Sequence, residues 1–320
     1  MNERGSKPVG PPDPVFILAP PCTLSWVVCA ILGEHPQMYA LPELHLFTSE
    51  SMSEWHQRSA RASYDMDQGL LRAVAEIVFG AQTDAMILRA RGWLVRREHL
   101  TTGRLLESIL QRLAPLVAVE RSPSVVSDIE AMGRMREMFP CARFLHLVSH
   151  PQLYGESVMQ ALAELSQSTS LAESHWLAQL ANAGIHSGDG RLIESEPDPQ
   201  WSWLSFHEKI VEFLDAVPDA QKQTVRGEEF SGSLGAILQW LDLRTDRDAM
   251  EMMRHPERST YAGPGPSSAP YGSDIFVRAG PLFRPEWTDR RSLTDPVSWS
   301  RNGYKLSRDV EDLARSFGYQ

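Results

Sequence analysis

The sequence predicts an α/β fold in which a parallel sheet is flanked by helices. Apolar runs at residues 15–19, 114–120 and 143–148 are separated by helix-forming segments, and residues 224–230, with an acidic end, are a candidate for a short fourth strand. A strand buried on both faces reads as such a continuous run, and parallel strands need a crossover that is usually a helix. Ligands of such sheets bind at the carboxyl ends of the strands.

The chain begins with a polar, proline- and glycine-rich segment, residues 1–14, which we expect to be a flexible lead. After the first strand and a turn at residues 20–25, apolar residues from Trp26 to Leu32 recur at helical spacing. Pro36 ends this helix, because the residue before a proline avoids the helical region. A helix N-terminus is a natural place for a phosphate or sulfate; an ordinary βα unit without a ligand is the alternative.

Residues 49–113 predict a helical insertion within a single domain. They lack the alternation of a strand and are rich in Ala, Leu, Arg, Glu and Met. We expect several helices there, with breaks near Gly80, Gly92 and residues 101–103.

The second half of the chain continues the alternation of strands and helices. Helices are expected at residues 124–139, 155–182, 203–217 and 233–243, with a loop at 184–199. Glycine, proline, serine and alanine dominate residues 261–273, which predicts a long, lid-like loop. We place the main domain at residues 15–300 and a closing C-terminal helix at 301–320.

Composition argues against several classes of protein. The chain has 31 Lys and Arg against 41 Asp and Glu, a net charge of −10, whereas proteins that bind the nucleic-acid backbone are typically basic. No apolar run approaches the roughly 20 residues of a membrane helix, and the N-terminus lacks the apolar core of a secretory signal. Three cysteines without C-x-x-C spacing argue against a disulfide framework or a zinc site. We expect a cytoplasmic protein with no metal and no nucleic-acid or membrane partner.

Three motifs in one order resemble a known family. Residues 20–47 read PPCTLSWVVCAILGEHPQMYALPELHLF, residues 120–151 read ERSPSVVSDIEAMGRMREMFPCARFLHLVSHP, and residues 225–230 read VRGEEF. In order and spacing they resemble PAPS-dependent sulfotransferases of the bacterial type associated with polyketide and peptide assembly lines. PAPS is 3′-phosphoadenosine 5′-phosphosulfate. The resemblance, which runs from about Val15 to Asp274, implies a P-loop-like parallel sheet flanked by helices.

The resemblance also implies two contact regions for PAPS. The family's first loop, P-R-S-G-S/T-T, cradles the 5′-phosphosulfate, and its cofactor-binding positions fall on Cys22, Thr23, Leu24, Ser25 and Trp26. The family's 3′-phosphate pair, an arginine and a serine, falls on Ser149 and Ser157. Thr23, Ser25 and Ser157 keep a hydroxyl.

The departures from this pattern change the chemistry of the expected PAPS site. Leu24 puts a branched side chain where a glycine lets the backbone approach a phosphate. Cys22 stands at the basic position and offers no positive charge to a transferring sulfonate. Ser149 replaces an arginine and so loses a charge-assisted contact worth roughly 1.5–3 kcal/mol. The sequence therefore predicts a degenerate P-loop, in which the cradle is kept in outline and its use of PAPS is open.

The acceptor side keeps its expected catalytic group. Glu43 falls on the position of the family's general base, nine residues into the H-P segment. Such a base is needed because a hydroxyl attacks poorly until its proton is removed. His45 is a second catalytic candidate, and a capping or ion-pairing role in a loop is the alternative for Glu43.

Three other residues each have two interpretations. Cys22 at a helix N-terminus is a candidate reactive thiol or a small packing residue. Arg121 is a candidate remaining cation of the pocket, or half of a surface ion pair. His146 lies in an apolar strand, where a core residue is expected rather than a catalyst.

Three functions follow from these features. The leading hypothesis is a tailoring transferase of secondary metabolism that moves a sulfonyl group from PAPS to a hydroxyl of a small-molecule or carrier-protein-bound acyl substrate. The second keeps the fold and uses Glu43 and His45 for acid–base chemistry without PAPS, such as dehydration, cyclisation or acyl transfer. The third is a non-catalytic binding or scaffold protein.

Overall fold

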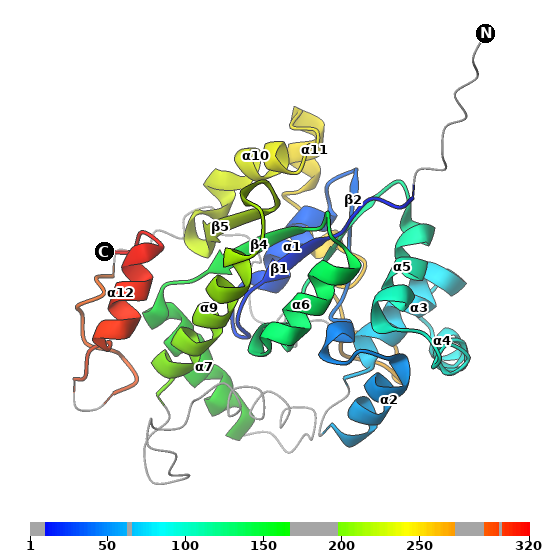
Figure 1. Ribbon diagram of the computed structural model, residues 1–320, viewed down its shortest axis with the longest axis horizontal. Helices are drawn as coiled ribbons and strands as arrows, with labels where there is room; N and C mark the ends of the chain where they lie inside the picture. Colours follow the sequence, from blue (N-terminus) through cyan, green and yellow to red (C-terminus); the bar gives the residue numbers. More distant parts are fainter. Residues whose placement is uncertain (1–9, 63–65, 167–197, 273–290, 301–302) are drawn as a thin grey trace.

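The computed structural model describes residues 10–62, 66–166, 198–272, 291–300 and 303–320. Within these ranges five parallel strands form one sheet in the order β2-β3-β1-β4-β5 (Figure 1). The strands are β1 (Val15–Leu18), β2 (Met38–Ala40), β3 (Val117–Glu120), β4 (Arg143–Val148) and β5 (Lys222–Arg226). The predicted parallel α/β sheet is confirmed.

Helices surround this sheet (Figure 1). They are α1 (Ser25–Gly33), α2 (Met52–Arg61), α3 (Gln68–Phe79), α4 (Asp84–Val95), α5 (Thr102–Leu113), α6 (Ile129–Met138), α7 (Pro151–Ser166), α9 (Gln200–Asp215), α10 (Phe230–Trp240), α11 (Arg247–Met252) and α12 (Arg308–Ser316). None of the helices within the described ranges has both the length and the apolar character that crossing a membrane would require.

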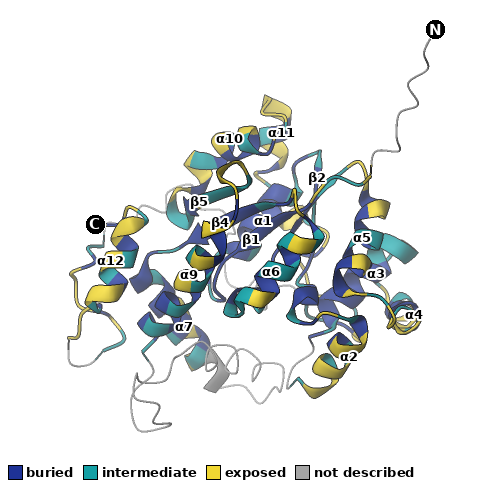
Figure 2. Ribbon diagram, in the orientation of Figure 1, coloured by how far each residue is buried: buried dark blue, intermediate teal, exposed yellow. Residues whose placement is uncertain are grey.

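The strands bury alternate residues on the two faces of the sheet. Phe16 and Leu18 of β1 pack with α6, α9 and the inserted helices α2–α5, whereas Val15 and Ile17 pack with α1 and α10 on the other face. This is the period of two expected of a strand. Figure 2 shows the central strands β1, β3 and β4 buried between the helical layers, whereas the edge strands β2 and β5 are mostly of intermediate burial. With both faces covered, the carboxyl ends of the strands are where side chains can gather around a ligand.

The insertion between β2 and β3 is helical, as predicted, and two of its three predicted breaks are confirmed. Gly80 ends α3 with a left-handed φ of 84°, and Thr101 caps α5 by accepting a hydrogen bond from the Arg104 N–H. The break predicted near Gly92 is wrong, because Gly92 lies inside α4. A single glycine costs a helix roughly 1 kcal/mol, and burial of the α4 residues Ile87 and Trp93 outweighs that cost.

Several predicted boundaries move. The three-residue strand β2 was not predicted, because so short a segment shows no pattern. The predicted helix at 124–139 begins only at Ile129, after a 3-10 turn, η2 (Val125–Ser127), and an Asp128 cap. The predicted fourth strand ends at Arg226, since residues 227–229 form the 3-10 turn η5 (Gly227–Glu229).

Other predicted segments are described only in part. α7 is described as far as Ser166. The rest of the helix predicted to residue 182, and all but the last two residues of the 184–199 loop, lie outside the described residues. The predicted flexible lead is described from Gly10 onwards, and residues 261–272 contain neither helix nor strand, as expected. The predicted C-terminal helix is α12, which is shorter than residues 301–320.

Candidate functional site

Glu43 and Arg121 form an ion pair at the carboxyl ends of neighbouring strands. Glu43 follows β2 and Arg121 follows β3, and the parallel pairing of these strands brings the two loops together. The Arg121 Nη2 donates to Glu43 Oε1, and Nη1 donates to the Ser25 Oγ at 2.8 Å. Arg121 is only 4% exposed, so the alternative of a surface ion pair is wrong. It links the acceptor-side carboxylate to the first turn of α1.

His45 joins this network through both ring nitrogens. Its Nε2 lies 3.2 Å from Glu43 Oε2, and its Nδ1 lies 2.6 Å from the Ser124 Oγ. The backbone of His45 is left-handed, with φ of 52°, which turns the chain sharply after Glu43. The sequence proposal paired Glu43 with His45, and the structure places them in contact. Ser124 was not singled out, and its only signal was its place in the E-R-S-P-S motif.

Glu120 and Ser122 support the turn from behind. The Ser122 Oγ accepts a hydrogen bond from the His45 N–H at 2.9 Å and donates to Glu120 Oε1, which also accepts from the Leu44 N–H at 3.4 Å. Glu120 is fully buried, and this burial raises the pKa of its carboxyl to about 7. Hydrogen bonds from main-chain N–H groups of the loop that carries Glu43 and His45 to side chains at the end of β3 therefore hold this loop in place.

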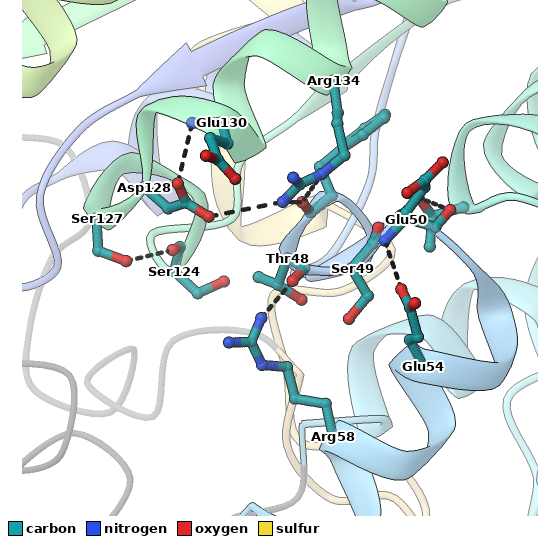
Figure 3. Close-up of polar contacts among 12 residues, drawn as sticks. Thr48, Ser49, Glu50, Glu54, Arg58, Ser124, Ser127, Asp128, Glu130 and Arg134 are labelled. Atoms are coloured by element: carbon teal, nitrogen blue, oxygen red, sulfur yellow. Dashed lines mark hydrogen bonds and ion pairs between the residues drawn. The ribbon is translucent and has the colours of Figure 1, made fainter.

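The segment after His45 is also held at its carbonyl groups. η1 (Leu46–Thr48) follows the turn, and the Arg134 guanidinium donates to the Phe47 carbonyl at 2.7 and 3.0 Å. The Arg58 side chain donates to the Thr48 carbonyl (Figure 3). Two arginines from α2 and α6 thus anchor this segment.

A pocket opens beside the Glu43–Arg121 pair. Its lining joins α1, the segment after β2 and the loop that begins at residue 259, and comprises Trp26, Cys29, Ala30, Ala40, Leu41, Pro42, Glu43, Arg121, Ser259, Tyr261 and Ala262. Most of these side chains are apolar, and Glu43 and Arg121 supply its charges. Its volume of about 30 Å³ has room for one or two water-sized groups, such as the hydroxyl end of a substrate.

In the first loop, the side chains from Cys22 to Ser25 face the protein itself, whereas Trp26 lines the pocket. Cys22 is left-handed, with φ of 59°, and packs against the apolar cluster that contains Tyr154 and Tyr319. The Thr23 hydroxyl donates to the Pro20 carbonyl at 2.8 Å. Leu24 packs against the apolar core on the α1 side of the sheet. The packing interpretation of Cys22 therefore fits its surroundings.

Ser149 lies on the connection from β4 to α7 and Ser157 lies within α7, both outside the Glu43 network. Ser149 accepts the indole N–H of Trp203 at its carbonyl, at 2.9 Å, while its Oγ is buried without a hydrogen-bond partner among the described residues. Ser157 is exposed on α7. The fully buried His146 lies 2.8 Å from His207 Nδ1, which agrees with a core role. Within the described ranges no cluster of His, Cys, Asp and Glu is arranged to hold a metal ion.

Comparisons with known proteins identify the family. The sequence model described as "Sulfotransferase family" matches residues 14–247, which is most of the chain. The chain belongs to the sulfotransferase family. A search of curated proteins finds no match.

Two solved sulfotransferase domains share the fold. The sulfotransferase domain from the curacin biosynthetic pathway superposes with a TM-score of 0.73 at 18% identity, covering 98% of this chain and 99% of that one. The sulfotransferase domain of the Synechococcus PCC 7002 olefin synthase gives a TM-score of 0.68 at 20% identity, covering 98% of each chain. The family resemblance and the sulfotransferase-like fold predicted from the sequence are confirmed.

The residues present do not fit the phosphosulfate of PAPS. A phosphosulfate needs cations and donors directed at its oxygens. The loop at residues 20–26 contains no Lys or Arg, and the Thr23 hydroxyl donates to a protein carbonyl instead. The cation that reaches Ser25 is Arg121, whose other amino group is bound to Glu43. The sulfotransferase fold is therefore kept here with a donor loop directed toward the protein's own atoms.

Proposed function

We propose that this member of the sulfotransferase family is a cytoplasmic tailoring enzyme of secondary metabolism. It acts on a hydroxylated acyl or small-molecule substrate, free or bound to a carrier protein, with Glu43 and His45 as its acid–base centre. The observation that carries the proposal is the 3.2 Å contact between these two side chains, with Glu43 in the wall of the pocket. The names of the two solved relatives, from a curacin pathway and an olefin synthase, support the class of pathway.

The geometry suits the transfer of a proton. The Glu43 carboxylate is held at one oxygen by Arg121 and at the other by His45, and its side chain is 20% exposed. A substrate hydroxyl in the pocket gives its proton to this pair, and the same pair returns a proton to a leaving group. General acid–base catalysis of this kind contributes typically 10²–10⁴-fold to a rate.

The donor loop favours chemistry that does not use PAPS. Dehydration, cyclisation and acyl transfer each need a base and an acid but no phosphosulfate. The second candidate is sulfonyl transfer from PAPS, which is favoured by the family match over residues 14–247. The two candidates share Glu43 and differ in the donor.

A melting experiment with 3′-phosphoadenosine 5′-phosphate separates these candidates. A ligand present at 100 times its Kd stabilises a protein by about 2.7 kcal/mol, which is a measurable shift in Tm. We expect no shift at millimolar nucleotide. A clear shift would overturn the PAPS-independent version and favour sulfonyl transfer.

Substitution of the base tests the acid–base centre itself. Metabolite extracts of the producing cells are compared for the wild type, Glu43→Gln and a deletion strain. Glu43→Gln is expected to lower the product by at least tenfold, while Glu50→Gln, an exposed control from the same segment, leaves it unchanged. Product at the normal level in Glu43→Gln contradicts the assignment, and loss of product only in the deletion strain supports a scaffold instead.

A further inference from the structure

Ser124, His45 and Glu43 form a continuous chain of polar contacts. The Ser124 Oγ lies 2.6 Å from His45 Nδ1, and the Nε2 of the same ring lies 3.2 Å from Glu43 Oε2. A hydroxyl within hydrogen-bond reach of a base that is oriented by a third group is the signature of an activated nucleophile. We propose that Ser124 is a nucleophile that accepts an acyl group from a thioester or ester, with His45 as its base and Glu43 as the acid that orients His45. The proposal rests on the proposed function for the Glu43–His45 centre and names its substrate class.

The position of the His45 ring is fixed from several sides. The main-chain N–H of His45 donates to the Ser122 hydroxyl at 2.9 Å. Its main-chain carbonyl accepts from the Trp55 indole at 3.1 Å and from the Thr48 hydroxyl at 2.6 Å. With both main-chain groups bound and the ring 5% exposed, the imidazole keeps one orientation. A base held in this way needs little reorganisation at the moment of proton transfer.

Ser124 is held by its backbone and leaves its side chain for His45. It follows Pro123 at the start of η2, where the Ser127 hydroxyl donates to its carbonyl at 2.8 Å. Figure 3 shows that contact, with the Ser124 hydroxyl on the other side. The residue is half-buried, so it combines a fixed main chain with partial access from solvent.

The charges of the triad match its proposed roles. In the tautomer that carries hydrogen on Nε2, His45 donates to Glu43 and presents the Nδ1 lone pair to the Ser124 hydroxyl. When Nδ1 takes the proton, the positive imidazolium faces the Glu43 carboxylate. Arg121 binds the other oxygen of that carboxylate and keeps it directed at the ring.

The acylation step balances as follows for a thioester. The Ser124 Oγ forms a bond to the carbonyl carbon while its proton moves to His45 Nδ1. The carbon–sulfur bond then breaks, and the proton passes from Nδ1 to the departing sulfur, which leaves as a thiol. The acyl group is now an ester on Ser124. A hydroxyl of the second substrate, or water, attacks that ester by the same steps and restores the free serine.

Acetylation by S-acetyl-N-acetylcysteamine tests the proposal without the natural substrate. The full chain is incubated with this thioester and denatured, so that the triad no longer activates the ester. Neutral hydroxylamine then removes acetyl groups from cysteines, and the chain is mapped by peptide mass spectrometry. We expect one acetyl group on Ser124 in the wild type and none at this position in Ser124→Ala. The rate falls at least tenfold in His45→Asn, since asparagine tolerates the left-handed backbone at this position.

A matched control and a second readout keep the result interpretable. Ser231→Ala, at an exposed serine on α10, is expected to be acetylated at Ser124 at the wild-type rate. An unlabelled Ser124 in the wild type, or equal rates in the wild type and His45→Asn, would overturn the proposal. Metabolite extracts separate it from the proposed function, because normal product in Ser124→Ala with loss in Glu43→Gln removes the nucleophile and keeps the acid–base centre.

Discussion

Gly69 in the first turn of α3 lies directly against the main-chain carbonyl of Glu43. A Cβ at Gly69 would be 2.0 Å from that oxygen. The Glu43 N–H donates to the Gly272 carbonyl at 3.0 Å, and Gly272, which itself packs against Gly69, has a left-handed φ of 93°. The main chain of Glu43 is therefore clamped by contacts with α3 and with the end of the 261–272 loop, which is how elements remote in sequence position this carboxylate.

This contact predicts a large effect for a single methyl group. Gly69→Ala is expected to lower the unfolding free energy by about 1–3 kcal/mol and to lower product formation, because the neighbour is backbone and Glu43 must move. Gly133→Ala is the control, since a Cβ at Gly133 in α6 meets nothing within 4 Å; it should gain about 0.5–1 kcal/mol. Urea unfolding measures both, and equal stabilities for the two variants would contradict the clamp.

The buried ion pair predicts that Arg121 is needed for stability as well as for the site. Removing one partner of a buried pair leaves the other charge uncompensated and costs about 3 kcal/mol. Arg121→Met is therefore expected to show this loss in urea unfolding. Arg104→Gln, which breaks an exposed pair with Glu107, should change stability by less than about 1 kcal/mol. A loss of similar size in both variants would contradict the conclusion that the buried Arg121 ion pair matters more for stability than an exposed one.

Glu120 predicts a pH dependence between its unfolded and folded pKa values. Burial raises the pKa of this carboxyl from 4.5 to about 7, so between these pH values the folded state binds a proton that the unfolded state has lost. The stability due to Glu120 is present below pH 4.5 and is lost as the pH rises through 7, by about 3 kcal/mol.

Glu120→Gln tests this effect because glutamine resembles the protonated acid and does not titrate. The stability of the variant relative to the wild type should rise by about 3 kcal/mol between pH 4.5 and 8, as measured by urea unfolding at several pH values. Glu137→Gln, an exposed control on α6, should show no such trend. A difference that does not change with pH would mean that Glu120 is ionised in the fold.

The sequence predicted best those strands of the sheet that are covered by helices on both faces. β4 has its predicted bounds and β1 ends one residue early, because continuous apolar runs are what a covered parallel sheet requires. β2 could not be predicted, since a strand of three residues at the edge of the sheet is too short to show a pattern of apolar residues. The helices of the insertion were predicted from composition and from the lack of strand alternation, while the break at Gly92 was wrong because burial outweighs the local preference of one glycine.

The pairing of Glu43 with His45 was predictable along the chain, and Arg121 was a candidate cation of the same pocket. Glu43 and His45 are two residues apart, so one motif contains both. Arg121 and Ser124 come from the next strand of the sheet, and only the parallel pairing of β2 with β3 brings their loops to the same edge. The clamp by Gly69 had no sequence signal at all, since a close approach of two backbones depends on packing.

The buried pair of His146 and His207 predicts a loss of stability in acid. Burial lowers the pKa of His146 to about 3 and that of His207 well below its usual 6.5. Below pH 6.5 these histidines therefore bind protons in the unfolded chain but stay neutral in the folded protein. The unfolding free energy falls by about 1.4 kcal/mol for each histidine and each unit by which the pH is lowered. In His207→Gln the unfolding free energy should depend less steeply on pH between pH 6.5 and 4, by about 1.4 kcal/mol per pH unit. His99→Gln, an exposed control, should leave this dependence unchanged. Parallel stability curves for the wild type and His207→Gln would show that His207 is protonated in the fold.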